Sequence, residues 1–180
     1  MKKVKKENRE KIMEMIGKAG SEKYETSWNK AGVFSTSKKK SNVKRGMSSK
    51  AQGARFELKV RKDLESKGRI IDKWNNNVDL EEGKIISAKK KFNPFSKAMM
   101  LSSGFPDFIS IKLVHKELYS VIGVEVKMNG ILSKIEKEKC AWYLQKRIFS
   151  QIWIAKKGKK RGLIEYDDFM EKYGKKYNKI

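Results

Sequence analysis

The chain has one cysteine and one histidine among its 180 residues. Cys140 alone excludes an internal disulfide and a metal site built from several thiolates. His115 alone argues against zinc hydrolase chemistry, which usually requires two or more imidazole ligands. Two large classes of proteins, disulfide scaffolds and zinc enzymes, are therefore disfavoured.

Long hydrophobic runs are also missing, since no stretch approaches the roughly 18 apolar residues that cross a bilayer. The first six residues are basic, but no apolar stretch of the signal type follows them. We therefore expect an intracellular, cytoplasmic protein without a membrane partner.

Acidic residues are scarce relative to basic ones. Forty-four Lys and Arg stand against twenty-one Asp and Glu, a formal net charge of +23. Such an excess attracts nucleic acid, where released counterions supply much of the binding free energy. A Lys-rich composition that serves only solubility usually raises Glu as well. The charge therefore favours a nucleic-acid partner over mere solubility or an anionic membrane.

The pattern along the chain predicts a basic N-terminal extension, residues 1–47, before a domain over 48–180. The extension begins with a charged helix over 2–18, whereas 35–42 is too polar to order itself and is expected to form a basic arm or linker. The stretch 75–103 has no clear periodicity, and we treat it as an insertion.

Within the domain the pattern predicts an alternation of helices and strands, hence an α/β fold with a mixed sheet flanked by helices. Ser48 or Ser49 is expected to cap the first helix, Ser133 with Glu136 the second, and Asp167 the last. The expected elements, in order, are helix 51–67, strand 69–74, turn 75–77, strands 108–113 and 119–127, helix 133–148, strands 151–155 and 162–166, and a final helix.

Two carboxylates and a lysine lie at the ends of the two central strands. Asp107 opens one strand, and Glu125 and Lys127 close the next, where alternation puts both on one face while Val126 faces the core. A hairpin can bring Asp107 beside Glu125. Paired carboxylates suit Mg²⁺, and a neighbouring lysine can hold or help deprotonate a water, as phosphodiester hydrolysis requires.

Pro106-Asp107 followed by Glu125-Val126-Lys127 resembles the motif of the PD-(D/E)xK nuclease superfamily, in particular archaeal Holliday junction resolvases and virus-type replication-repair nucleases. The resemblance implies a restriction-endonuclease-like fold. It also implies that Asp107, Glu125 and the Val126 carbonyl bind Mg²⁺ or Mn²⁺ and that Lys127 is catalytic. The Gly53 to Glu57 segment resembles the opening helix of those resolvases, which makes Glu57 a fourth candidate. Glu136 stands where the virus-type enzymes often have Gln, and here a capping role is favoured.

We therefore expect a Mg²⁺-dependent DNA endonuclease, structure-selective in repair, recombination or replication. One alternative is a junction resolvase, which would act as a homodimer. Others are a DNA-binding module that has lost its chemistry and a basic structural protein, although the latter leaves the strand-borne carboxylates unexplained.

Basic residues outside the site are candidate phosphate contacts, although on exposed surfaces they are often plain solvated charge. Phe92 and Phe95 could stack on unpaired bases, or else form a subunit contact or fill the core. The candidate DNA-binding residues are Lys38, Lys39, Lys40, Lys44, Arg45, Arg61, Lys89, Lys90, Lys91 and Lys134.

Overall fold

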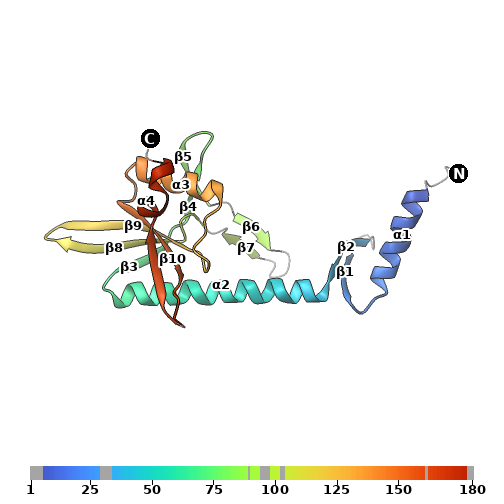
Figure 1. Ribbon diagram of the computed structural model, residues 1–180. Helices are drawn as coiled ribbons and strands as arrows, with labels where there is room; N and C mark the ends of the chain where they lie inside the picture. Colours follow the sequence, from blue (N-terminus) through green and yellow to red (C-terminus); the bar gives the residue numbers. More distant parts are fainter. Residues whose placement is uncertain are drawn as a thin grey trace. The chain divides into compact units, whose positions relative to one another are not determined.

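The computed structural model describes residues 6–28, 34–88, 90–93, 98–101, 104–160 and 162–177, and the side chains of 9–27, 38–88, 104–160 and 162–177 (Figure 1). The chain divides into two compact units, Met1–Ala54 and Arg55–Ile180. None of the helices in the described ranges combines the length and hydrophobicity needed to cross a bilayer.

The N-terminal unit contains helix α1 (Lys6–Ala19) and an antiparallel hairpin of β1 (Tyr24–Trp28) and β2 (Phe34–Lys39). The expected helix at 2–18 is therefore confirmed over most of its length. The expectation that 35–42 stays without structure is wrong, because β2 covers part of it and a helix begins at Lys40. Pairing with β1 supplies the backbone hydrogen bonds that a polar segment cannot obtain from burial.

Helix α2 (Lys40–Ser66) begins about ten residues before the predicted start. Ser48 and Ser49 lie inside it, so the predicted cap at either serine is wrong. Its buried side chains, Phe56, Val60 and Leu64, recur every four residues and form one apolar stripe.

A five-stranded mixed sheet forms the centre of the C-terminal unit, in the order β11-β10-β9-β8-β3. All neighbours are antiparallel except β9 and β10, which are parallel and are connected through helix α3 (Lys134–Gln145). The strands are β3 (Ile70–Lys73), β8 (Phe108–His115), β9 (Leu118–Val126), β10 (Gln151–Lys157) and β11 (Ile164–Asp168). The predicted α/β class and the predicted order of these elements are confirmed.

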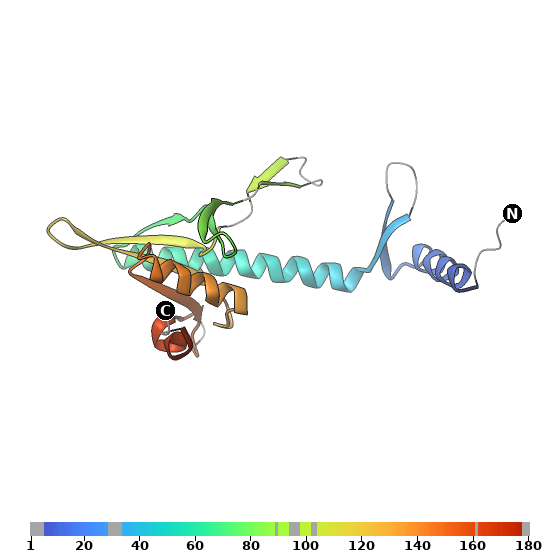
Figure 2. The same ribbon diagram turned by 90° about the horizontal axis from the view of Figure 1, so that it is seen from above.

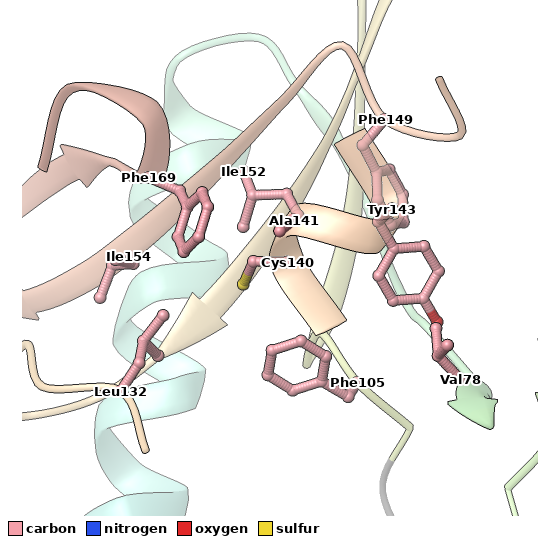
Figure 3. Close-up of a cluster of buried hydrophobic side chains, with 10 residues drawn as sticks. All are labelled: Val78, Phe105, Leu132, Cys140, Ala141, Tyr143, Phe149, Ile152, Ile154 and Phe169. Carbon is pink, nitrogen blue, oxygen red and sulfur yellow. The ribbon is translucent and has the colours of Figure 1, made fainter. Parts of the chain in front are cut away.

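The sheet has a hydrophobic core on each face. On one face Phe56, Val60 and Leu64 of α2 pack with Phe108, Ile122 and Val124 of the sheet. On the other, α3 and helix α4 (Phe169–Tyr177) pack through the cluster drawn in Figure 3, in which Cys140, Tyr143, Ile152 and Phe169 are fully buried. Figure 1 shows α2 and α3 on opposite sides of the sheet, and Figure 2 gives the same elements seen from above.

Two small antiparallel hairpins occupy much of the stretch between β3 and β8. The first pairs β4 (Asn76–Asp79) with β5 (Lys84–Ser87), and the second pairs β6 (Lys90–Asn93) with β7 (Ala98–Leu101). The predicted turn at 75–77 is wrong, because Asn76 and Asn77 belong to β4 and pair with Ser87 and Ile86.

The last helix is capped by Asp168 and not by Asp167. Asp168 Oδ1 accepts hydrogen bonds from the N–H groups of Met170 (2.8 Å) and Glu171 (3.2 Å). Asp167 instead pairs with Lys156 and Lys172, each at 2.6 Å. The predicted cap at Asp167 is therefore wrong, because the ion pairs to Lys156 and Lys172 hold its carboxylate away from the helix N-terminus.

Candidate active site

Asp107 is held at the start of β8 by close backbone packing just before it. A Cβ on Gly104 would lie 1.8 Å from the Trp74 carbonyl oxygen, so only glycine fits there. Phe105 and Pro106 are buried, and the Phe105 N–H donates to the Asn76 carbonyl oxygen (2.9 Å). These contacts fix the backbone that presents the Asp107 carboxylate.

The neighbouring strand β9 is shaped to receive Pro106. A Cβ on Gly123 would lie 2.8 Å from Pro106 Cγ and 3.2 Å from the Phe149 ring. Glycine at this position therefore allows the Pro106-Asp107 segment to lie flat against β9.

The hairpin of β8 and β9 brings Asp107 and Glu125 together. Phe108 pairs with Val124, so Asp107 and Glu125 are the next opposed positions along the ladder. The Asp107 N–H donates to Glu125 Oε2 (3.2 Å), and the Val126 N–H donates to Asp107 Oδ2 (2.9 Å). Each carboxylate is thus anchored by the backbone of the opposite strand.

Lys127 lies on the same face as Glu125, as strand alternation predicts. Its Nζ is 3.0 Å from Glu125 Oε1 and 2.6 Å from Glu136 Oε1. Val126, between them, packs against the core that α2 covers. Glu125 of β9, Lys127 just after that strand and Glu136 of α3 therefore meet beside Asp107.

Glu136 has two partners at once. It is the third residue of α3, where its Oε2 accepts the Ser133 N–H (2.7 Å) and completes the predicted capping box. Its other oxygen, Oε1, forms the ion pair with Lys127 Nζ. The capping role is confirmed, and the contact with Lys127 was not predicted, because only the packing of α3 on the sheet creates it.

Burial gives the Glu125 carboxyl unusual proton affinity. Glu125 is only 4% exposed. Burial, and next the charge of Asp107, raise its pKa to about 8, although Lys127 works in the opposite direction. Burial likewise raises the pKa of Asp107, against the lowering effect of the Val126 N–H. A pair of crowded, dehydrated carboxylates favours a bound proton or a cation.

Lys127 remains charged in this environment. Burial lowers the pKa of Lys127, but the hydrogen bond to Glu136 and the charge of Glu125 outweigh burial, so the pKa lies above its ordinary value. The pKa of Glu136 is lowered, since the hydrogen bonds from Lys127 and Ser133 outweigh burial. Lys127 can therefore donate hydrogen bonds at neutral pH but cannot accept a proton.

Glu57 lies near this group without joining it. Its Oε2 pairs with Lys73 Nζ at 2.7 Å, while its charge contributes to the raised pKa of Asp107. Arg61, one of the candidate DNA contacts, donates to Glu65 (2.8 Å) and to the Ile71 carbonyl oxygen (3.2 Å). Lys73 was not predicted as a site residue, because only the pairing of β3 with β8 places it opposite Phe108.

The other candidate DNA contacts are dispersed. Lys134 is exposed on α3, at 3.9 Å from Glu138. Lys89 and Phe95 lie outside the described residues, and Lys90, Lys91 and Phe92 are described only as backbone of β6. In the N-terminal unit the side chains of five further candidates are exposed, namely Lys38, Lys39, Lys40, Lys44 and Arg45.

The donors around Asp107 fit a hard divalent cation. Mg²⁺ is usually held by one or two carboxylates, with waters and substrate phosphate completing its shell. Asp107, Glu125 and the Val126 carbonyl supply such a set. Burial, and after it the charge of a neighbouring carboxylate, raises the pKa of both carboxyls, and a bound cation would offset both effects. No group of three or more His, Cys, Asp or Glu side chains suited to a metal occurs in the described ranges, and the Glu57 carboxylate pairs with Lys73.

Compared with protein-family models, curated proteins and solved structures, the chain has no significant match.

Proposed function

We propose that this protein is a Mg²⁺-dependent DNA endonuclease, with a restriction-endonuclease-like fold and a PD-(D/E)xK site. The observation that carries the proposal is the meeting of Asp107, buried Glu125 and charged Lys127 at the end of one hairpin. The five-stranded mixed sheet, with α2 before β3 and α3 between two parallel strands, supports the fold assignment. The formal charge of +23 supports DNA as the partner.

In the proposed reaction a water oxygen forms a bond to the phosphorus, and one P–O ester bond breaks. The water loses a proton to solvent, and the leaving oxygen takes one up. Bound Mg²⁺ would supply positive charge against the crowded phosphate and acidify the attacking water.

The chain's own residues would bind and orient. Asp107 and Glu125, with the Val126 carbonyl, would hold the cation, and their anchoring by opposite strands keeps the two carboxylates from moving apart. Lys127, held by Glu136, would donate a hydrogen bond to a phosphate oxygen or to the attacking water. Its raised pKa assigns it to charge stabilisation and positioning, not to proton abstraction.

The test is a cleavage panel of linear, nicked, flapped and four-way DNA with Mg²⁺ or with chelator. We expect cleavage only with metal, and a loss of about 100-fold or more in Asp107→Asn and Lys127→Ala. Lys112→Ala, a charge change on the exposed part of β8, is the matched control and should cleave normally. Cleavage in chelator, or full activity in both site variants, would contradict the proposal.

A junction resolvase is the second candidate, and one observation favours it. A resolvase presents two sites in a dimer, and the tip of the β8–β9 hairpin exposes Leu113, Val114, Leu118 and Tyr119. Light scattering measures the oligomeric state, and the cleavage panel compares four-way DNA with linear duplex. A protein that is a monomer at micromolar concentration and cuts four-way DNA no better than linear duplex eliminates this candidate.

A further inference from the structure

A recess lies on the face of the sheet covered by α2, on the opposite side from the carboxylates. Its volume is about 250 Å³. It is formed between α2 and the connection from β10 to β11. The lining residues are Phe56, Lys59, Lys157, Gly158, Lys160, Gly162, Leu163 and Ile164.

The apolar wall of this recess is fixed by the backbone. A Cβ on Gly158 would lie 2.9 Å from Leu163 Cβ, so glycine is what allows Leu163 to lie there. The Gly158 N–H donates to the Leu163 carbonyl oxygen (2.9 Å), and the Leu163 N–H donates to that of Lys160 (3.1 Å). Leu163 is nevertheless 51% exposed, so its apolar surface is available to a ligand.

Three lysines surround this apolar wall. Lys59, Lys157 and Lys160 form no ion pair with any residue that the structure describes, in contrast to Lys156, which pairs with Asp167 and Glu165. Three uncompensated cations at one opening favour an anionic ligand.

The recess and the candidate active site share one end of the parallel strand pair. The Lys127 N–H donates to the Ala155 carbonyl oxygen (2.9 Å), and the Lys157 N–H donates to that of Met128 (3.2 Å). Residues 126–128, which include a site lysine, therefore run beside residues 155–157, which lead into the recess.

We propose that this recess binds an unpaired nucleotide of the DNA, with its base on Leu163 and Ile164 and its flanking phosphates on the three lysines. The inference rests on the proposed function and specifies its substrate class, namely DNA with unpaired nucleotides near the scissile phosphate. Phosphate binding alone would account for the lysines but not for the apolar wall. A paired base is stacked inside the duplex, whereas an unpaired base has a free face for apolar contact.

The size of the recess agrees with this assignment. Pockets for drug-sized ligands usually measure about 300 to 1,000 Å³, so a volume of about 250 Å³ suits one planar group and not a longer ligand.

The test measures binding without cleavage, by fluorescence anisotropy in chelator, of a flapped DNA and a fully paired DNA of equal length. We expect wild type to prefer the flap by about fivefold or more, and Leu163→Ser to remove most of that preference. Leu113→Ser is the matched control, because Leu113 is 53% exposed on the β8–β9 hairpin and distant from the recess in the sheet. The fluorescence of a 2-aminopurine base in the flap should change when wild type or Leu113→Ser binds, and it should not change when Leu163→Ser binds.

Equal binding of flapped and paired DNA by wild type overturns the inference, as does a Leu163→Ser protein that behaves like Leu113→Ser. Both variants replace exposed side chains, and circular dichroism verifies that they fold. The failure of the two proposals is distinguishable: metal-dependent cleavage without flap preference contradicts only the recess, and flap preference without cleavage contradicts only the nuclease.

Discussion

The β8–β9 hairpin has two ends with opposite character. Its base, around Asp107 and Glu125, is buried, whereas from Lys112 to Tyr119 every residue is exposed. Both ends carry a glutamate: Glu125 at the base is buried and its pKa is raised to about 8, whereas Glu117 at the tip is exposed. Neighbours at the base bury the Glu125 carboxyl and crowd it with Asp107, whereas none of the residues from Lys112 to Tyr119 is buried. Chemistry at the base therefore depends on the packing around the residue and not on its type.

The largest effect is expected for activity. Glu125→Gln keeps the shape of the side chain and removes the charge that would hold the cation, so DNA cleavage should fall by about 1,000-fold or more. Glu117→Gln makes the same change at the tip and should leave the rate within about twofold of wild type. Initial cleavage rates with Mg²⁺ measure the effect in both variants. A similar loss of rate in the two would contradict the proposed difference between the base and the tip of the hairpin.

The second prediction concerns stability as a function of pH. The pKa of Glu125 in the folded protein, about 8, lies above its ordinary value of 4.5. The folded state therefore binds a proton between these values that the unfolded chain has released. The metal-free protein should accordingly lose stability as pH rises from about 5 to about 8, with a slope of up to about 1.4 kcal/mol per pH unit from this group.

Urea unfolding in chelator across that range measures the slope. Glu125→Gln should flatten it, while Glu117→Gln should retain it. A wild-type protein that becomes more stable as pH rises would show that Glu125 is ionised in the folded state.

The third prediction concerns the packing that presents Asp107. In Gly123→Ala the new Cβ meets Pro106 Cγ at 2.8 Å, and overpacking of this kind costs about 1 to 3 kcal/mol. Activity should fall along with stability, because the same contact positions Asp107. Lys112→Ala, toward the tip, should change the free energy of unfolding by less than about 0.5 kcal/mol. Urea denaturation compares the two, and equal values would contradict the assigned role of Gly123.

The smallest effect is expected at Glu57, which pairs with Lys73 and influences Asp107 only through its charge. Glu57→Gln should reduce the cleavage rate by less than about tenfold, while Asp107→Asn loses far more. A loss at Glu57 as large as that at Asp107 would make Glu57 a direct ligand in the active enzyme.

The sequence predicts those features of the fold and the site that depend on residues close together in the chain. The capping box of Ser133 and Glu136 needs only residues three apart, and it was predicted correctly. The strands around Asp107 and Glu125 have clear alternation, so their pairing could be anticipated. The first half of α2 has no stripe of buried apolar residues, so no periodic pattern in the sequence predicts that the helix begins at Lys40.

Long-range contacts account for what was missed at the site. Lys127 directly follows β9, whereas Glu136 is in α3. Nothing in either segment predicts that their side chains form an ion pair. The same holds for Glu57 with Lys73, and for the choice of Asp168 over Asp167 as helix cap. Residue types and spacing indicate the chemistry, whereas the partners that tune it arise from packing.

The most direct test of the account is calorimetric titration of Mn²⁺ into the metal-free protein near neutral pH, in two buffers with different ionisation enthalpies. Because the pKa of Glu125 is about 8, binding should release protons, and the measured heat should differ between the buffers. We expect this in wild type and in Glu117→Gln, with binding lost in Glu125→Gln. A wild-type protein that binds no Mn²⁺, or a Glu125→Gln protein that binds it equally well, would contradict the assignment of this site.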